Sequence, residues 1–298
     1  MTANSGTKRL SFGQHVLDLI TLTRPAVVLL LLLTALTGLV VGAGAWPSFH
    51  LAFWTLLGGG LAAGGAQAVN QYMDRDIDRL MVRTANRPIP AGRLAPSQGL
   101  AWGLFLCVLS LFILAGMVNW LAAGVALMGI LYYDIIYTLL LKRTSVQNIV
   151  IGGGAGAMAP VVGVVAAASR LNLAALFLFT VVFLWTPPHF WALALVRLQD
   201  YRSANIPVMP VARGEKCTRN QIMIYTIALI VVTLLPAFVK ATGLIYLAAA
   251  PVLGAALLYV GWRLWQKGGN EFAGRLYRVS NLYLGLLFIA LVTDVVVK

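Results

Sequence analysis

The chain has 298 residues, of which 60% are hydrophobic and only 10% are charged, and its mean hydropathy is +0.86. Ordinary soluble domains carry about 25% charged residues, so this composition excludes that class and indicates a membrane protein. The formal net charge is +13, but the basic residues lie in short segments between apolar runs and do not form one patch. This distribution argues against nucleic acid as a partner.

The apolar runs predict nine transmembrane helices, since a membrane span needs about 20 residues. We therefore expect an all-α membrane protein in which residues 1–298 form one polytopic domain, a single helix bundle with a cytoplasm-facing cavity. Gly-rich stretches such as Gly58–Gly60 and Gly152–Gly154 favour close approach of helices within it. The predicted spans are 26–45, 49–70, 97–117, 119–140, 146–168, 172–195, 220–239, 242–262 and 278–297.

The distribution of basic residues predicts the topology. With the N-terminus in the cytoplasm, all but three of the 22 lysines and arginines fall on the cytoplasmic side, the exceptions being Arg170, Lys240 and Lys298. Residues 1–24 show no cleavable signal and form a cytoplasmic segment. We expect a multi-pass protein of the cytoplasmic (inner) membrane, with its site on the cytoplasmic loops 71–96 and 197–219.

The end of the second predicted span carries the most informative polar pattern. Asn70, Asp74 and Asp78 are four residues apart and share one helix face, whereas Asp76 lies about 200° around from Asp74. Acidic groups at a membrane boundary are unfavourable unless a cation lies among them. Magnesium held by one or two carboxylates and by substrate phosphates suits such oxygen donors. We predict that Asn70, Asp74 and Asp78 are catalytic and bind Mg²⁺.

Arginines 75, 79, 83 and 87 form a second stripe at the same spacing, next to the acidic one. Together the stripes suit a metal diphosphate, because the metal and the arginines would both neutralise a leaving diphosphate. The alternative is a set of solvated surface ion pairs. Aromatic faces stabilise an allylic cation. The candidates, each of which could equally be a core or interfacial residue, are Tyr72, Tyr132, Tyr133, Tyr137 and Trp191.

The pattern Asn70-x3-Asp74-x3-Asp78 resembles the first aspartate motif of the UbiA-type intramembrane prenyltransferases. The chain is most similar to the branch of that superfamily that farnesylates heme B, over most of residues 20–215. Further motifs carry this resemblance: Thr23-Arg24-Pro25, Arg87-Pro88-Ile-Pro90, Tyr137-Thr138 with Leu141-Lys142-Arg143-Thr144, Asn148-Ile-Val-Ile-Gly-Gly-Gly, Pro188-His189-Phe190-Trp191, Asp200-Tyr201 and Asn205-Ile-Pro207.

The resemblance implies a nine-helix fold whose cavity takes farnesyl diphosphate and heme B, with Mg²⁺ as cofactor. It implies transfer of farnesyl to a heme vinyl group, which gives hydroxyethylfarnesyl heme (heme O). The lipid bilayer is the expected surrounding, and a downstream heme A synthase or terminal-oxidase assembly factors are candidate partners. The substrate-binding residues that the motifs suggest are Arg75, Arg83, Arg87, Tyr137, Lys142, Arg143, Asn148, His189, Arg197, Asp200 and Tyr201.

The second acidic motif departs from the superfamily pattern. It offers Asp200 as a further metal ligand, but Gln199 stands where this branch often has another acid. Two more polar residues allow two interpretations each. His189 is either hydrogen-bonded structure after a proline pair or a heme contact, and Asn148 either binds substrate or caps the fifth span. Asp134 is a functional candidate because an ionisable group within a span is unfavourable.

Two other functions are compatible with parts of the pattern. A different UbiA-type transfer, to a hydroxybenzoate, a quinone precursor or a chlorophyllide, differs only in the acceptor. A transporter also uses acids and Gly-broken helices, but acids gathered on one membrane side suit a one-sided catalytic cavity better. A CDP-alcohol phosphotransferase is disfavoured because its Asp-Gly…Ala-Arg pattern is absent from this segment.

Overall fold

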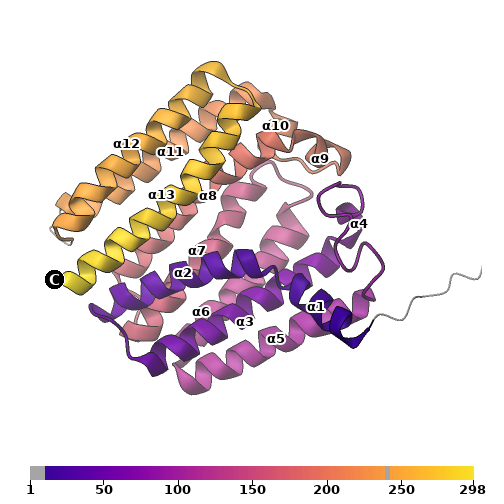
Figure 1. Ribbon diagram of the computed structural model, residues 1–298, viewed down its shortest axis with the longest axis horizontal. Helices are drawn as coiled ribbons and strands as arrows, with labels where there is room; N and C mark the ends of the chain where they lie inside the picture. The colour runs from indigo at the N-terminus through magenta and orange to yellow at the C-terminus, as the bar shows by residue number, and fades with distance from the viewer. Residues whose placement is uncertain (1–10, 239–241) are drawn as a thin grey trace, which may run out of the picture.

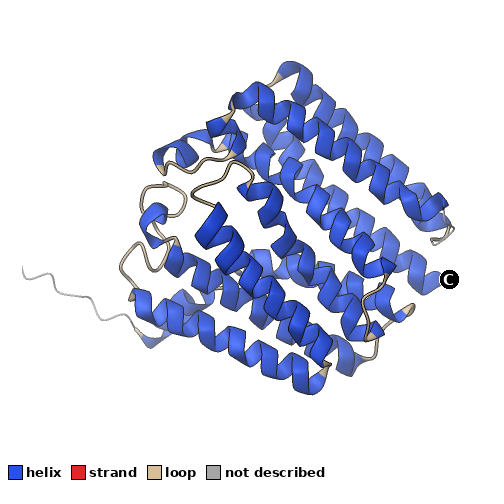
Figure 2. Ribbon diagram, turned by 180° about the vertical axis from the view of Figure 1, so that it is seen from behind, coloured by secondary structure: helices blue, strands red, loops and turns tan. Residues whose placement is uncertain are grey.

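A computed structural model describes residues 11–238 and 242–298, and within these residues the regular structure is entirely helical (Figures 1 and 2). The long helices lie side by side in one bundle. In chain order they are α2 (Pro25–Ala43), α3 (Phe49–Met73), α5 (Pro96–Met117), α6 (Trp120–Leu131) continuing into the π-helix η1 (Tyr132–Leu141), α7 (Asn148–Ala168), α8 (Leu173–Val196), α11 (Gly214–Phe238), α12 (Leu244–Lys267) and α13 (Asn270–Val297).

Eight helical segments in the described part of the chain are long and apolar enough to cross a membrane, with α6 and η1 counted as one. The expectation of an all-α membrane protein is therefore confirmed, whereas the number of nine spans is not. The long helix outside this set is α3, whose last turns carry polar residues. Lys240 and the last residue of the predicted span 220–239 lie outside the described residues, as do residues 1–10.

The last three helices begin or end beyond the predicted bounds. Helix α11 starts at Gly214, α12 runs on to Lys267, and α13 starts at Asn270. Hydropathy marks only the apolar part of a helix, whereas charged turns at its end reach the aqueous phase and stay helical. The pair Glu271–Arg275, spaced i,i+4 with a contact of 2.5 Å, supports such a turn at the start of α13.

Glycines allow the closest helix contacts. A Cβ on Gly38 of α2 would lie 2.0 Å from the carbonyl oxygen of Pro160 in α7, and one on Gly163 would lie 2.0 Å from that of Ala35. Gly152 of α7 makes room for a side chain of η1. A Cβ there would lie 2.3 Å from the ring of Tyr137.

The short helices and polar loops gather at one end of the bundle. Helix α4 (Arg75–Asp78) lies near α9 (Leu198–Ser203), and α10 (Met209–Ala212) follows (Figure 1). The Ser203 hydroxyl donates to the carbonyl of Leu80 over 3.1 Å, which joins the loops after α3 and α8. Helix α1 (Phe12–Leu22) is fixed at the same end, because Arg93 donates to both carboxylate oxygens of Asp18 at 3.1 Å.

Candidate active site

The last turn of α3 and the helix α4 bring three polar side chains together. Asp74 ends α3 and begins α4, and its carbonyl accepts from the backbone N–H of Asp78, so the helical spacing continues through the junction. The exposed fractions of Asn70, Asp74 and Asp78 are 1%, 0% and 1%. The structure thus groups the three residues on one face, as the spacing predicts, and their catalytic roles stay predictions.

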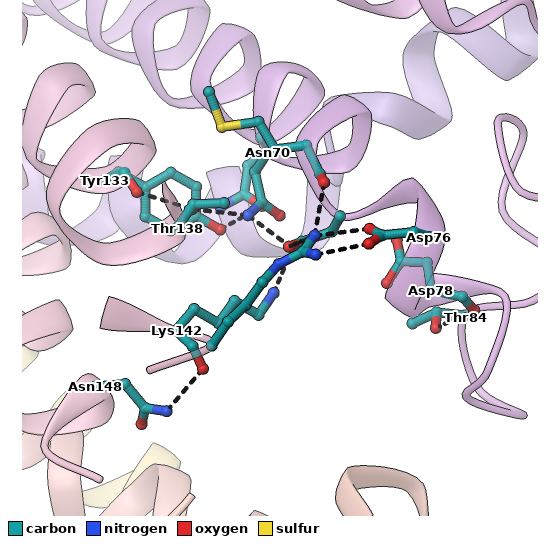
Figure 3. A network of polar contacts seen from close by, with 12 residues as sticks. Asn70, Asp76, Asp78, Thr84, Tyr133, Thr138, Lys142 and Asn148 are labelled. Carbon is teal, nitrogen blue, oxygen red and sulfur yellow. Dashed lines mark hydrogen bonds and ion pairs between the residues drawn. The ribbon is translucent and has the colours of Figure 1, made fainter. Parts of the chain in front are cut away.

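Asp74 contacts Asn70, Lys142 and Arg143 and so is the centre of a polar network; Asn70, Lys142 and Asp76 are labelled in Figure 3. Asp74 Oδ2 accepts from Asn70 Nδ2 at 2.9 Å and from the ammonium of Lys142. Its Oδ1 is buried and has no hydrogen-bond partner among the residues that the structure describes, and Arg143 Nη2 lies 4.0 Å from it. A buried carboxylate oxygen without a partner is unfavourable, and a hard cation is the ligand that would satisfy it.

Asn70 is held in one orientation by three partners. Its Nδ2 also donates to Thr138 Oγ1 at 2.9 Å, and its Oδ1 accepts from Arg24 Nη2 at 3.2 Å. Because the amide nitrogen serves Asp74 and Thr138, the amide oxygen faces the cationic side of the site. Asn70 therefore can offer an oxygen to a metal or a substrate without breaking its contact with Asp74.

Asp78 and Asp76 have separate cationic partners. Arg87 Nη1 donates to Asp78 Oδ2 at 2.6 Å, and burial lowers the pKa of Arg87, an effect that Asp78 opposes. Arg143 donates to both oxygens of Asp76 at 2.6 and 2.7 Å. This contact lowers the pKa of Asp76 to about 2. The Asp76 side chain is 60% exposed, whereas that of Asp74 is fully buried, and the Arg143 guanidinium lies within 4.0 Å of both carboxylates.

Lys142 follows the π-helix η1 and is positioned through its backbone. Its N–H donates to the carbonyl of Tyr137 at 2.8 Å, and its own carbonyl accepts from Asn148 Nδ2 at 3.2 Å. Burial lowers the pKa of Lys142, and the Asp74 carboxylate opposes this shift. The alternative that Asn148 caps α7 is wrong, because Gln147 occupies the cap position. In the described part of the chain, the buried Oδ1 of Asn148 has no hydrogen-bond partner.

Not every predicted arginine reaches the carboxylates. Arg75 donates to the carbonyl of Tyr72 at 2.7 Å and lies 4.4 Å from the centre of that ring, so it is engaged within its own turn. Arg83 is exposed, and its charge acts on the Tyr201 hydroxyl. Of the predicted stripe, Arg87 alone forms an ion pair with Asp74 or Asp78 among the described residues.

From the second loop, Tyr201 lies within range of the charges of Arg24 and Arg87; Asp200 directly precedes it, and the Arg197 carbonyl accepts from its N–H at 3.3 Å. Burial raises the pKa of Tyr201, while the charges of Arg83, Arg24 and Arg87 oppose that shift. Within the described residues no ion pair is formed by Asp200, and no group of three His, Cys, Asp or Glu side chains could hold a metal by itself. The predicted metal ligands therefore do not form a closed protein cage.

His189 lies in a packed aromatic cluster of α8 and α13. Its Nδ1 is 2.9 Å from the Ser280 hydroxyl, and its ring is stacked between Trp185 and Tyr277 at centroid distances of 4.2 and 4.6 Å. These contacts favour the structural interpretation of this histidine. Its predicted contact with heme stays a prediction. Trp191 is fully buried against Tyr225 and is a core residue.

Two site residues were not predicted as such. Arg24 reaches Asn70 from the junction of α1 and α2, where its own φ is 50°, and Thr138 bonds to Asn70 from η1. Arg24 precedes a proline at the start of a span, but basic residues commonly flank spans. The sequence therefore does not distinguish Arg24 from other basic residues that flank spans. A left-handed backbone at a non-glycine residue is uncommon and is not predictable from the sequence.

Comparison with known proteins assigns the chain to a family. The model of the UbiA prenyltransferase family matches residues 31–291. The chain belongs to this family. It is 48% identical over 280 residues to a protoheme IX farnesyltransferase from Roseiflexus sp. (strain RS-1), which covers 94% of this chain and 52% of the relative. It is 45% identical to one from Symbiobacterium thermophilum, covering 96% of this chain and 97% of the relative.

The chain thus spans about half the length of several curated relatives that it matches, and nearly all of others. Solved structures share its fold. One described for digeranylgeranylglyceryl phosphate synthase has a TM-score of 0.80 at 15% identity, covering 96% of this chain and all of the other. A UbiA homologue from Archaeoglobus fulgidus bound to DMAPP and Mg²⁺ has a TM-score of 0.64 at 16% identity, covering 93% and 99%. This family member is a multi-pass membrane protein.

Proposed function

We propose that this chain transfers a farnesyl group from farnesyl diphosphate to a vinyl group of heme B and so produces heme O. The name and the 45–48% identity of the relatives support this acceptor. The observation that carries the chemistry is the buried Asp74, whose Oδ1 has no partner in a cluster lined by Lys142 and Arg143. Such a cluster suits a metal diphosphate better than a neutral substrate.

The described residues fit a magnesium ion. Asp74 Oδ1, a carboxylate oxygen of Asp78 and the amide oxygen of Asn70 are the donors that would hold it, and substrate phosphates complete such sites. When bound, Mg²⁺ neutralises charge on the leaving diphosphate. Asp200 is a further candidate ligand. It sits on α9, one residue before Tyr201, whose hydroxyl is within range of the charges of Arg24 and Arg87.

The chain's own cations bind and orient the diphosphate. Arg24, Arg87, Lys142 and Arg143 surround Asn70, Asp74, Asp76 and Asp78, so developing negative charge on the leaving oxygen meets fixed positive charges. Arg75 is the weakest of the predicted ligands, since it contacts Tyr72. Departure of the diphosphate leaves an allylic cation on the prenyl chain.

The stacked rings of Tyr133 and Tyr137 would face that cation. Their centroids are 5.6 Å apart, and the Lys142 ammonium lies 6.0 Å from the centre of the Tyr137 ring. The vinyl group of heme attacks the cation, and water then adds to the porphyrin-side carbon and loses a proton. The same rings and the apolar bundle restrict water near the cation before the attack.

The proposal extends to how the acceptor is held and to the location of the protein. We infer that the exposed arginines Arg83 and Arg197 of the two polar loops hold the heme propionates beside Tyr201, since guanidinium groups bind carboxylates in a bidentate manner. We also propose one polytopic domain in the cytoplasmic (inner) membrane, with the N-terminus and the site in the cytoplasm. Heme A synthase and terminal-oxidase assembly factors are the partners expected downstream.

A reconstituted assay tests the function. Purified protein in detergent is incubated with radiolabelled farnesyl diphosphate, heme B and Mg²⁺, and the hemes are separated by chromatography. Label that migrates with heme O supports the proposal, whereas label found only on an added hydroxybenzoate or quinone precursor would replace heme as the acceptor. Hemes extracted from cells that lack or overproduce the protein give the matching test in vivo, and an unchanged content of heme O would contradict the assignment.

A further inference from the structure

Lys142 occupies an unusual place for a substrate-binding lysine, because it already has a buried partner. Its ammonium contacts Oδ2 of Asp74, a residue with 0% exposure, and the lysine side chain is itself 14% exposed. Its backbone is held by hydrogen bonds with Tyr137 and Asn148, and these fix the position from which the lysine side chain extends. Lys142 is thus placed on one oxygen of the carboxylate whose other oxygen would bind the metal.

The charges of the cluster favour an anion over a bare cation. Each carboxylate has a cation of its own: Asp74 has Lys142, Asp78 has Arg87, and Asp76 has Arg143. The fourth cation, Arg24, bonds to the neutral amide of Asn70. Four cations therefore face three carboxylates, and a bare divalent ion would add two more positive charges to a cluster that already has an excess.

The position of Lys142 makes this repulsion local. An ion at Oδ1 of Asp74 would lie on the same carboxylate as the ammonium at Oδ2, and charges a few ångströms apart in a partly buried site interact strongly. A metal that arrives with a diphosphate brings its own negative charge. The ammonium can then turn from a competitor into a ligand of the diphosphate oxygens.

We propose that Lys142 makes binding of a divalent cation at Asp74 conditional on diphosphate. It disfavours the bare ion and favours the metal diphosphate, so that the site does not fill with metal alone. This inference rests on the proposed function, because it assumes that Asp74 binds the metal of a prenyl diphosphate. In this positioning role, Lys142 weakens the binding of the bare ion and strengthens the binding of the metal diphosphate.

Equilibrium dialysis of ⁵⁴Mn²⁺ against the purified full-length protein in detergent measures this role without turnover. Retention of manganese is compared with and without inorganic pyrophosphate, which crosses the dialysis membrane. We expect wild-type protein to bind Mn²⁺ at least about tenfold more tightly with pyrophosphate, a difference of about 1.4 kcal/mol. Lys142→Met should bind bare Mn²⁺ at least about tenfold more tightly than wild type and lose most of the effect of pyrophosphate.

Two further variants complete the test. Lys142→Arg keeps the charge and should behave as wild type, and Lys216→Met removes an exposed lysine of α11 as a matched control. Bare Mn²⁺ that binds Lys142→Met no more tightly than wild type overturns the inference. Wild-type protein that binds Mn²⁺ equally well without pyrophosphate overturns it independently of any variant. If the wild-type protein retains no manganese even with pyrophosphate, the result contradicts the proposed function and not the role of Lys142 alone.

Discussion

Replacing Asp74 by asparagine separates the structural contribution of this residue from its chemical one. The substitution keeps the volume of the side chain but removes the charge that Lys142 faces. Both members of this ion pair are largely buried, with side-chain exposures of 0% and 14%. Removing one partner of a buried pair leaves an uncompensated charge and destabilises a protein by about 3–5 kcal/mol.

The double variant Asp74→Asn with Lys142→Met removes both charges. Replacing a buried pair by neutral groups is often close to neutral for stability, so the double variant should regain most of the stability that Asp74→Asn loses. Its prenyl transfer should stay low, by about 10²–10³-fold or more, because neither the metal ligand nor the ammonium is present at the leaving group. Stability should therefore differ between the two variants, while activity should stay low in both.

Denaturant unfolding in detergent, followed by tryptophan fluorescence, measures the stability, and transfer of label from farnesyl diphosphate to heme measures the activity. The exposed pair Asp76–Arg143 provides the control, since Asp76→Asn should change little in either assay. A double variant as unstable as Asp74→Asn alone would refute the electrostatic reasoning. Full activity in Asp74→Asn would refute the role of Asp74 in binding the metal diphosphate.

Three further predictions concern the surroundings of the site. Gly152→Ala should lower transfer at least about tenfold by displacing Tyr137, whereas Gly156→Ala, whose Cβ meets nothing within 4 Å, should not; initial rates of label transfer compare them. The Asp76–Arg143 pair should add at most about 1 kcal/mol to stability at neutral pH, because Asp76 is mostly exposed. Its carboxyl pKa falls from 3.8 to about 2 on folding, so this contribution is present above pH 3.8 and is lost as the pH falls through about 2. Unfolding of wild type and Asp76→Asn over that pH range tests it, and a difference that grows towards low pH would contradict it. Chelation by EDTA should abolish transfer while the unfolding midpoint of the substrate-free protein changes little, because the carboxylates already have cationic partners. A large drop in that midpoint would indicate a structural metal.

The sequence predicted the helices and the grouping of the acidic face, because both depend on local periodicity. Each predicted apolar run overlaps one of the long helices in the described part of the chain, and the i,i+4 spacing placed the buried Asn70, Asp74 and Asp78 together while Asp76 is exposed. The same local rule failed for the arginine stripe. Arg75 turns back to Tyr72 and does not contact a carboxylate. The partner of Asp76 is Arg143, which lies 67 residues further along the chain and is not part of the stripe.

Contacts between distant segments were beyond a single sequence for a physical reason. Arg24 reaches Asn70 across 46 positions, and it does so only because its backbone adopts a left-handed conformation between α1 and α2. Composition and periodicity describe the face of one helix but not the turn that directs a side chain towards another helix. The bounds of α11 and α13 failed similarly, since solvated helical turns carry no apolar signal.

The π-helix η1 explains why the residues of one segment meet the site at all. The Thr138 hydroxyl donates to the carbonyl of Tyr133 at 2.8 Å and accepts from Asn70, which fixes the wider turn against α3. Each residue of a π-helix turns less than the 100° of an α-helix, and the difference accumulates from Tyr132 to Leu141. An α-helix of the same sequence would therefore direct Lys142 to another face. The stacked tyrosines, Thr138 and Lys142 act at one site because the helix widens before it ends.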